Sequence, residues 1–116
     1  MNDTLTQLIP MARLEKAAEI LRLLAHPHRL RMCELLMQGR RPVKEIAEHL
    51  GIPQNAASQH LNMMKAHGIL DCHRQGKVVF YEVVDWRPAW LLGCIRDHIE
   101  PVDSRARRQS EPETRM

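Results

Sequence analysis

Two short amphipathic helical patterns follow each other in this chain with only a three-residue connection between them. Apolar side chains recur at i, i+3, i+4 and i+7 in residues 42–50, and at i, i+4 and i+7 in residues 54–67. Pro42 suits the first turn of the earlier helix, and Gly51 suits its end. Helices so closely connected are typical of a helix-turn-helix. The apolar positions are Val43, Ile46, Ala47, Leu50, Ala57, Leu61 and Met64.

A β-hairpin is expected directly after this pair. Gln75-Gly76 is a turn signal, and residues 77–83 after it are rich in β-branched and aromatic side chains. This order of elements is that of a winged helix-turn-helix: two short helices, the second with a polar face, and then a hairpin. In the helix-turn-helix motif the second helix enters the DNA major groove.

Amphipathic helices are also expected on both sides of this unit. Residues 14–24 and 28–37 have apolar positions at helical spacing, and His26-Pro27 separates them. Residues 86–99 form a last helix with Trp86, Trp90 and Cys94 on one line, a wide apolar face that we expect to pack on another subunit. The fold class is therefore mostly α with a β-hairpin wing, in a dimer. We divide the chain into a leader (1–11), the folded domain (12–99) and a polar, disordered tail (100–116).

Length and composition limit the function classes. The 116 residues suffice for one domain, and 44% apolar but only 3% aromatic residues favour an aliphatic, helical core. Neither a membrane span nor a signal peptide is found, and the three cysteines form no CxxC pair, so we expect a reduced, cytoplasmic protein. Short signatures of phosphate binding, zinc proteolysis and serine hydrolysis are missing, so no enzyme is expected. The net charge of +3 is compatible with an anionic partner.

The second helix of the motif has one polar, acid-free face. Asn and Gln side chains can bond bidentately to adenine, and Ser can bond to bases or phosphate, so this face has the chemistry of base readout. An ordinary solvated face would usually mix Glu and Lys, although an uncharged polar surface remains the alternative. The face consists of Gln54, Asn55, Ser58, Gln59 and Asn62.

Basic side chains surround this face. Lys65 and the pair Arg40-Arg41 are expected to contact phosphates, which position a protein without reading sequence. Arg74 and Lys77 flank the hairpin tip, where they can reach a minor groove or its phosphates, unless they are only solvated turn charges. His60 is expected to bond either phosphate or its own domain. The expected partner is double-stranded DNA.

Three stretches of this chain resemble the ArsR/SmtB family of dimeric winged-helix repressors. They are LAHPHRLR at residues 24–31, GIPQNAASQHL at residues 51–61 and RQGKVVFY at residues 74–81. The resemblance covers residues 12–99. It implies a homodimer built from the first and last helices, which represses an operon until an effector binds. Two recognition helices in such a dimer imply a pseudo-palindromic operator.

The family's metal sites are incomplete in this chain. Pro42 and Lys44 stand where some members have a pair of metal-binding cysteines on the helix of residues 42–50. The zinc site of the last helix retains only Asp85 and His98, because Arg87 and Pro101 stand at its other two positions. Zinc needs about four ligands, and a guanidinium repels the ion. We expect Asp85 to act as a helix cap and His98 as an interface residue, with zinc less favoured than other effectors.

The thiols are the remaining effector candidates. Cys33 and Cys94 lie on the two helices that carry cysteines in the family's sulfur-responsive members, but at other positions of those helices, so a bridge between them does not transfer. Cys33 lies within an apolar pattern, where a cysteine is usually inert, and Cys72 is expected near the wing. Cys94 is the first candidate for a thiol-directed effector such as arsenite or reactive sulfur.

Two alternatives remain open from the sequence. One is a repressor without any ligand, whose DNA affinity would ignore thiol and metal reagents. The other is a protein-interaction or metal-buffering module that has kept this fold and lost DNA binding. The acid-free face argues against the second.

Overall fold

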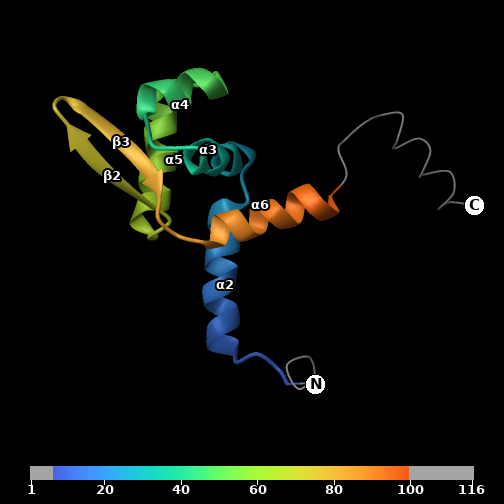
Figure 1. Ribbon diagram of the computed structural model, residues 1–116. Coiled ribbons are helices and arrows are strands. Elements are labelled where there is room, and N and C mark those ends of the chain that lie inside the picture. The colour runs from blue at the N-terminus through green and yellow to red at the C-terminus, as the bar shows by residue number, and fades with distance from the viewer. Residues whose placement is uncertain (1–6, 100–116) are drawn as a thin grey trace, which may run out of the picture.

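The computed structural model describes residues 7–99 as five helices and three strands (Figure 1). The expected tail and most of the expected leader lie outside these residues. None of the helices within 7–99 is long and apolar enough to cross a membrane. In chain order the elements are α2 (Met11–Leu24), α3 (Pro27–Met37), β1 (Arg41–Pro42), α4 (Val43–Leu50), α5 (Gln54–Ala66), β2 (Leu70–Gln75), β3 (Val78–Val83) and α6 (Arg87–His98).

The helix-turn-helix is formed by α4 and α5, and α3 packs beside both. Gly51 ends α4 with φ 68°, a left-handed conformation that costs little only for glycine, and Ile52 donates a backbone hydrogen bond to the Ala47 carbonyl. One aliphatic core holds these helices together. Its completely buried side chains include Met32, Cys33, Ile46, Ala57, Leu61, Met64 and Ile69.

The wing is a three-stranded antiparallel sheet in the order β1-β3-β2. β2 and β3 pair along their whole length from Leu70 opposite Val83 to Gln75 opposite Val78, so the tip consists of Gly76 and Lys77 rather than of Gln75-Gly76 as predicted. Gly76 has φ 64°, the positive φ that a tight hairpin needs. The predicted hairpin is confirmed, and it is extended by a strand that the sequence did not reveal.

The added strand corrects the prediction for Pro42. We expected this proline in the first turn of a helix. It lies instead in β1 opposite Phe80, at the N-cap position directly before α4. Proline lacks a backbone N–H, so it is tolerated only at the edge of a sheet, and β1 is an edge strand.

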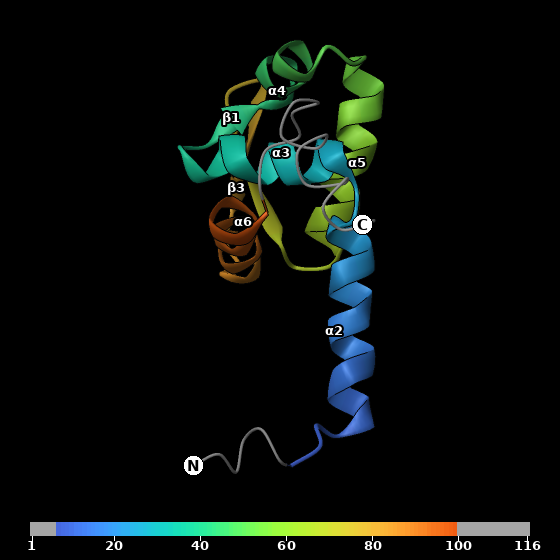
Figure 2. The ribbon, with the colours of Figure 1, turned by 90° about the vertical axis from the view of Figure 1, so that its right-hand side faces the viewer.

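The two outer helices are the least enclosed part of the molecule. α2 projects from the body as a rod, and α6 lies across α3 near the body end of α2 (Figures 1 and 2). α2 begins at Met11, one residue before the predicted domain start, and only Ile20, Leu23 and Leu24 in it are buried. The expected apolar face of α2 is therefore largely uncovered. On α6, Leu91 and Ile95 pack against the core, whereas Trp90 stays exposed, as does Trp86 just before the helix.

Candidate nucleic-acid interface

The predicted readout face lies on α5 and is open to solvent. Gln54, Asn55, Gln59 and Asn62 are exposed, and Ser58 is half-buried. Ala57, Leu61 and Met64 on the opposite side of the helix are buried in the core, so packing fixes which face of α5 points outward. Nothing acidic lies on this helix.

Two of the predicted DNA-contacting residues on α5 bond within the protein. The Tyr81 hydroxyl on β3 donates to Oδ1 of Asn62 at 3.0 Å, which ties α5 to the wing. His60 Nδ1 accepts a hydrogen bond from Arg29 Nε at 3.1 Å, which ties α5 to α3. Of the two roles weighed for His60, a bond to its own domain is therefore the one that the geometry favours.

The wing carries two exposed basic side chains near its tip. Arg74 is the last residue but one of β2, and Lys77 lies in the tip itself. Neither forms an ion pair with another residue in the range 7–99. His73, by contrast, pairs with Glu82 across the hairpin. Arg74 and Lys77 are thus available to a polyanion, and His73 is engaged.

The other basic side chains predicted to contact phosphates differ in how strongly the protein itself holds them. Lys65 is exposed at the end of α5, where contact with the side chain of Cys72 raises the pKa of Lys65. Arg40 lies over the ring of Phe80, 5.5 Å from its centre, a contact that the sequence pattern did not reveal.

Arg41 is the most constrained of the predicted phosphate contacts. It donates to the Leu35 carbonyl and to Gln38, and it pairs with Glu45 at 3.7 Å. A phosphate would compete with these partners for the guanidinium.

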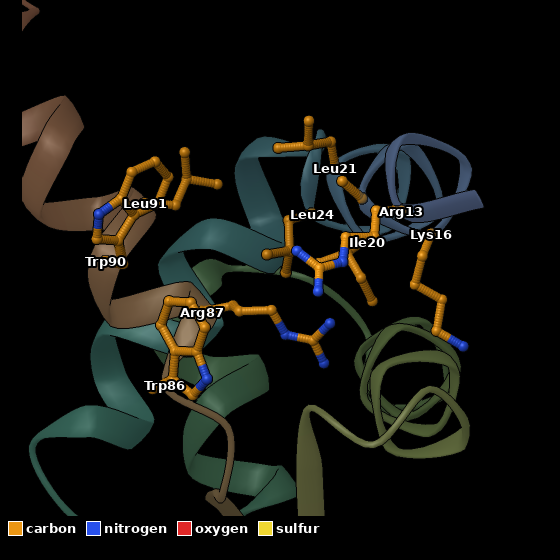
Figure 3. A pocket seen from close by; sticks show the side chains of 10 residues that line it. Arg13, Lys16, Ile20, Leu21, Leu24, Trp86, Arg87, Trp90 and Leu91 are labelled. Carbon is orange, nitrogen blue, oxygen red and sulfur yellow. The ribbon is translucent and has the colours of Figure 1, made fainter. Parts of the chain in front are cut away.

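A groove of about 490 Å³ runs between α2 and α6 (Figure 3). Its walls are mainly apolar, with Ile20, Leu21 and Leu24 from α2 facing Trp90 and Leu91 from α6. Trp86 is 70% exposed and Trp90 is 62% exposed. Large apolar surface left uncovered on two neighbouring helices is typical of a protein interface.

Comparison with known proteins gives the family. A helix-turn-helix domain model matches residues 24–73. The chain is 38% identical over 83 residues to the HTH-type transcriptional repressor SmtB of Mycobacterium tuberculosis, covering 72% of this chain and 62% of that repressor. It is 32% identical over 111 residues to a probable mercury resistance operon repressor of Streptomyces lividans, covering 92% of this chain and 89% of the relative.

A solved structure agrees with both relatives. The homodimeric winged helix-turn-helix DNA-binding domain of a possible ArsR-family regulator from Mycobacterium bovis superposes with a TM-score of 0.65 at 29% identity, covering 78% of this chain and 85% of that domain. This chain belongs to the ArsR/SmtB family. The predicted family and fold class are thereby confirmed, and the family is one of transcriptional regulators rather than enzymes.

The remnant of the family's zinc site on the last helix is occupied by an internal ion pair. Arg87 holds both carboxylate oxygens of Asp85, with Nε at 2.8 Å and Nη2 at 2.6 Å. The Arg87 guanidinium also lowers the pKa of Asp85. Asp85 Oδ1 accepts the backbone N–H of Arg87, the first residue of α6, while the residue at the N-cap position of this helix is Trp86. His98 is exposed in the last turn of α6, and the Asp85 carboxylate is engaged by Arg87.

The three thiols lie in different environments. Cys33 is fully buried with its sulfur 3.8 Å from that of Met64, and burial raises the pKa of the Cys33 thiol to about 12. Such a thiol is a core side chain and not a nucleophile. Cys72 on β2 and Cys94 on α6 are half-buried and remain accessible.

Proposed function

We propose that this protein is a homodimeric DNA-binding repressor that places α5 in the major groove. The observation that carries the proposal is the open, acid-free row of amide and hydroxyl side chains on α5. Beside it, the wing carries two exposed basic residues that form no ion pair within residues 7–99. Gln54, Asn55, Ser58 and Gln59 would contact bases. Arg74 and Lys77 would contact the backbone or minor groove at the wing, and Lys65 and Arg40 would add phosphate contacts.

The dimer would form through α2 and α6. Their facing apolar surfaces leave Trp86 and Trp90 largely exposed in the single chain, and the structural relative from Mycobacterium bovis is a homodimer. A twofold axis between two α5 helices requires a pseudo-palindromic operator, with half-sites about 34 Å apart or a multiple of it.

A thiol-directed effector is the form of regulation we propose for this repressor. Cys94 lies on α6, within the apolar face that we assign to the dimer, whereas the buried Cys33 is unsuited to react. An adduct at Cys94 would alter the relation between the two subunits. The Streptomyces relative, a probable mercury resistance operon repressor, is consistent with a soft, thiol-seeking effector.

Base readout is tested by two substitutions measured by fluorescence anisotropy on DNA from upstream of the gene and on a shuffled duplex. Gln59→Ala should weaken binding to upstream DNA by about 1–3 kcal/mol and leave the shuffled duplex unaffected. Lys77→Ala should weaken binding to both duplexes alike. It should also reduce the slope of log affinity against log salt concentration by about one. Equal losses on both duplexes for both variants would refute the assigned roles.

The effector is tested with the same assay. Arsenite or polysulfide should release the wild-type protein and the Cys72→Ser variant from upstream DNA, but not the Cys94→Ser variant. Release that persists in Cys94→Ser would exclude this thiol, and binding indifferent to both reagents would favour a ligand-independent repressor.

A further inference from the structure

Three histidines from two helices meet on one side of the molecule. His26 caps α3, His28 lies in its first turn, and His60 lies on α5. Their rings are 4.5 to 6.0 Å apart between centres, and one nitrogen of each ring lies within 4.8 Å of the other two. All three side chains are half-buried, so the cluster is held by the fold and still reached by solvent.

We propose that this cluster is a binding site for a borderline divalent transition-metal ion such as Zn²⁺. Imidazole nitrogen is a preferred ligand of such ions, which bind it at about 2.0–2.1 Å. Nitrogens within 4.8 Å of one another need only small side-chain rotations to converge on a single ion. Three protein ligands on the solvent side of the domain leave the fourth position to water.

One basic side chain opposes a cation at this cluster. Nε of Arg29 lies 3.1 Å from Nδ1 of His60. The Arg29 guanidinium repels a cation while it stays in place, so its position decides the affinity of the site.

Metal binding would displace Arg29 whichever ring nitrogen of His60 is used. His60 Nδ1 accepts the Arg29 Nε–H. An ion bound to Nδ1 would use the lone pair that accepts the Arg29 hydrogen bond. An ion bound to Nε2 would leave the ring proton on Nδ1, and Nδ1–H could then no longer accept the Arg29 Nε–H. The same reasoning applies to His26, whose Nδ1 accepts the His28 backbone N–H at 3.2 Å.

The site would therefore couple an ion to the position of α5. Arg29 also donates to the Leu23 carbonyl at 2.8 Å. This one side chain, in the first turn of α3, therefore links the end of α2 to α5. An ion would replace that link by a direct bridge from the start of α3 to the helix with the exposed amide face.

The test is a Co²⁺ titration of the reduced full-length protein, followed by visible absorption, with Zn²⁺ as the competitor. His28→Gln is the informative variant, because the His28 ring makes no hydrogen bond with the residues in the range 7–99. It should bind at least about tenfold more weakly than wild type. His49→Gln, which removes an exposed histidine from α4, should bind as wild type does. Equal affinities in all three proteins, or no binding by wild type, would overturn the proposal.

A second measurement uses only the wild-type protein, so its result does not depend on whether a variant folds. In nuclear magnetic resonance spectra of the wild-type protein, one equivalent of Co²⁺ should shift or broaden the ring signals of His26, His28 and His60 first. The exposed His49 and His67 serve as internal references. Changes first at these two histidines, or a thiolate-to-cobalt absorption band, would place the ion elsewhere and refute the site.

Discussion

At the residue scale, helical spacing predicts which way a side chain points but not which partner it finds. The exposure of Gln54, Asn55 and Gln59 follows from the period of the buried positions on α5. The bonds of Asn62 to Tyr81 and of His60 to Arg29 join residues 19 and 31 positions apart, so no local pattern encodes them. The histidine cluster was hidden from sequence reasoning for the same reason.

The burial of Cys33 makes a prediction for thiol labelling. Because the thiol is fully buried and its pKa is raised to about 12, Cys33 should stay unmodified by iodoacetamide at pH 8 while Cys72 and Cys94 react. Mass spectrometry of tryptic peptides measures this. All three should react in denaturant, and modification of Cys33 in the native protein would contradict the packing described for α3 and α5.

The lowered pKa of His60 makes a prediction for stability against pH. A folded-state pKa below the unfolded value of about 6.5 means that the unfolded chain binds the proton more readily. The contribution of His60 to the free energy of unfolding is therefore complete above pH 6.5. It is lost as the pH falls from 6.5 toward the lower pKa that His60 has in the folded protein. Urea unfolding with a chelator present should give a smaller loss of stability between pH 7 and pH 5 for His60→Gln than for wild type. The same loss in both would show that His60 is not the group responsible.

At the element scale, the helices were predictable because each has its own apolar period and stop signal, whereas β1 was not. A two-residue strand has no period to recognise, and its pairing with Tyr81 and Phe80 depends on segments far along the chain. Gly51, by contrast, was identified from sequence as the end of α4, and its positive φ agrees with that role.

The turn between α4 and α5 should depend on the backbone of residue 51. Gly51→Ala should destabilise the protein by about 1–2 kcal/mol, because alanine in the left-handed region is strained although its Cβ would meet no neighbour within 4 Å. Gly51→Asn should lose less, since asparagine tolerates this conformation better. Denaturant unfolding of both variants measures the difference, and equal stability of Gly51→Ala and wild type would contradict the turn geometry.

At the scale of the whole molecule, apolar side chains stay exposed on the side of α2 and α6. The apolar faces of both helices were predictable, and their use between subunits is what the family resemblance implies. Their arrangement around one groove was not, because it depends on how α6 crosses α3 and meets the end of α2 (Figures 1 and 2).

The groove residues should decide the oligomeric state. Trp90→Glu places a charge on the apolar wall of the groove and should convert a dimer to a monomer in sedimentation experiments at micromolar concentration. Met37→Glu, at an exposed apolar side chain on α3 away from the groove, should stay dimeric. A dimeric Trp90→Glu variant would move the subunit contact to another surface.

The most direct test of DNA recognition by a dimer is a titration of the reduced wild-type protein. Anisotropy is followed on upstream DNA and on a shuffled duplex of the same composition at several salt concentrations. We expect upstream DNA to be bound at least about 10³-fold more tightly, by two chains per duplex, with affinity falling steeply as salt rises. Equal affinity for both duplexes, or no binding to either, would contradict sequence-specific recognition by α5.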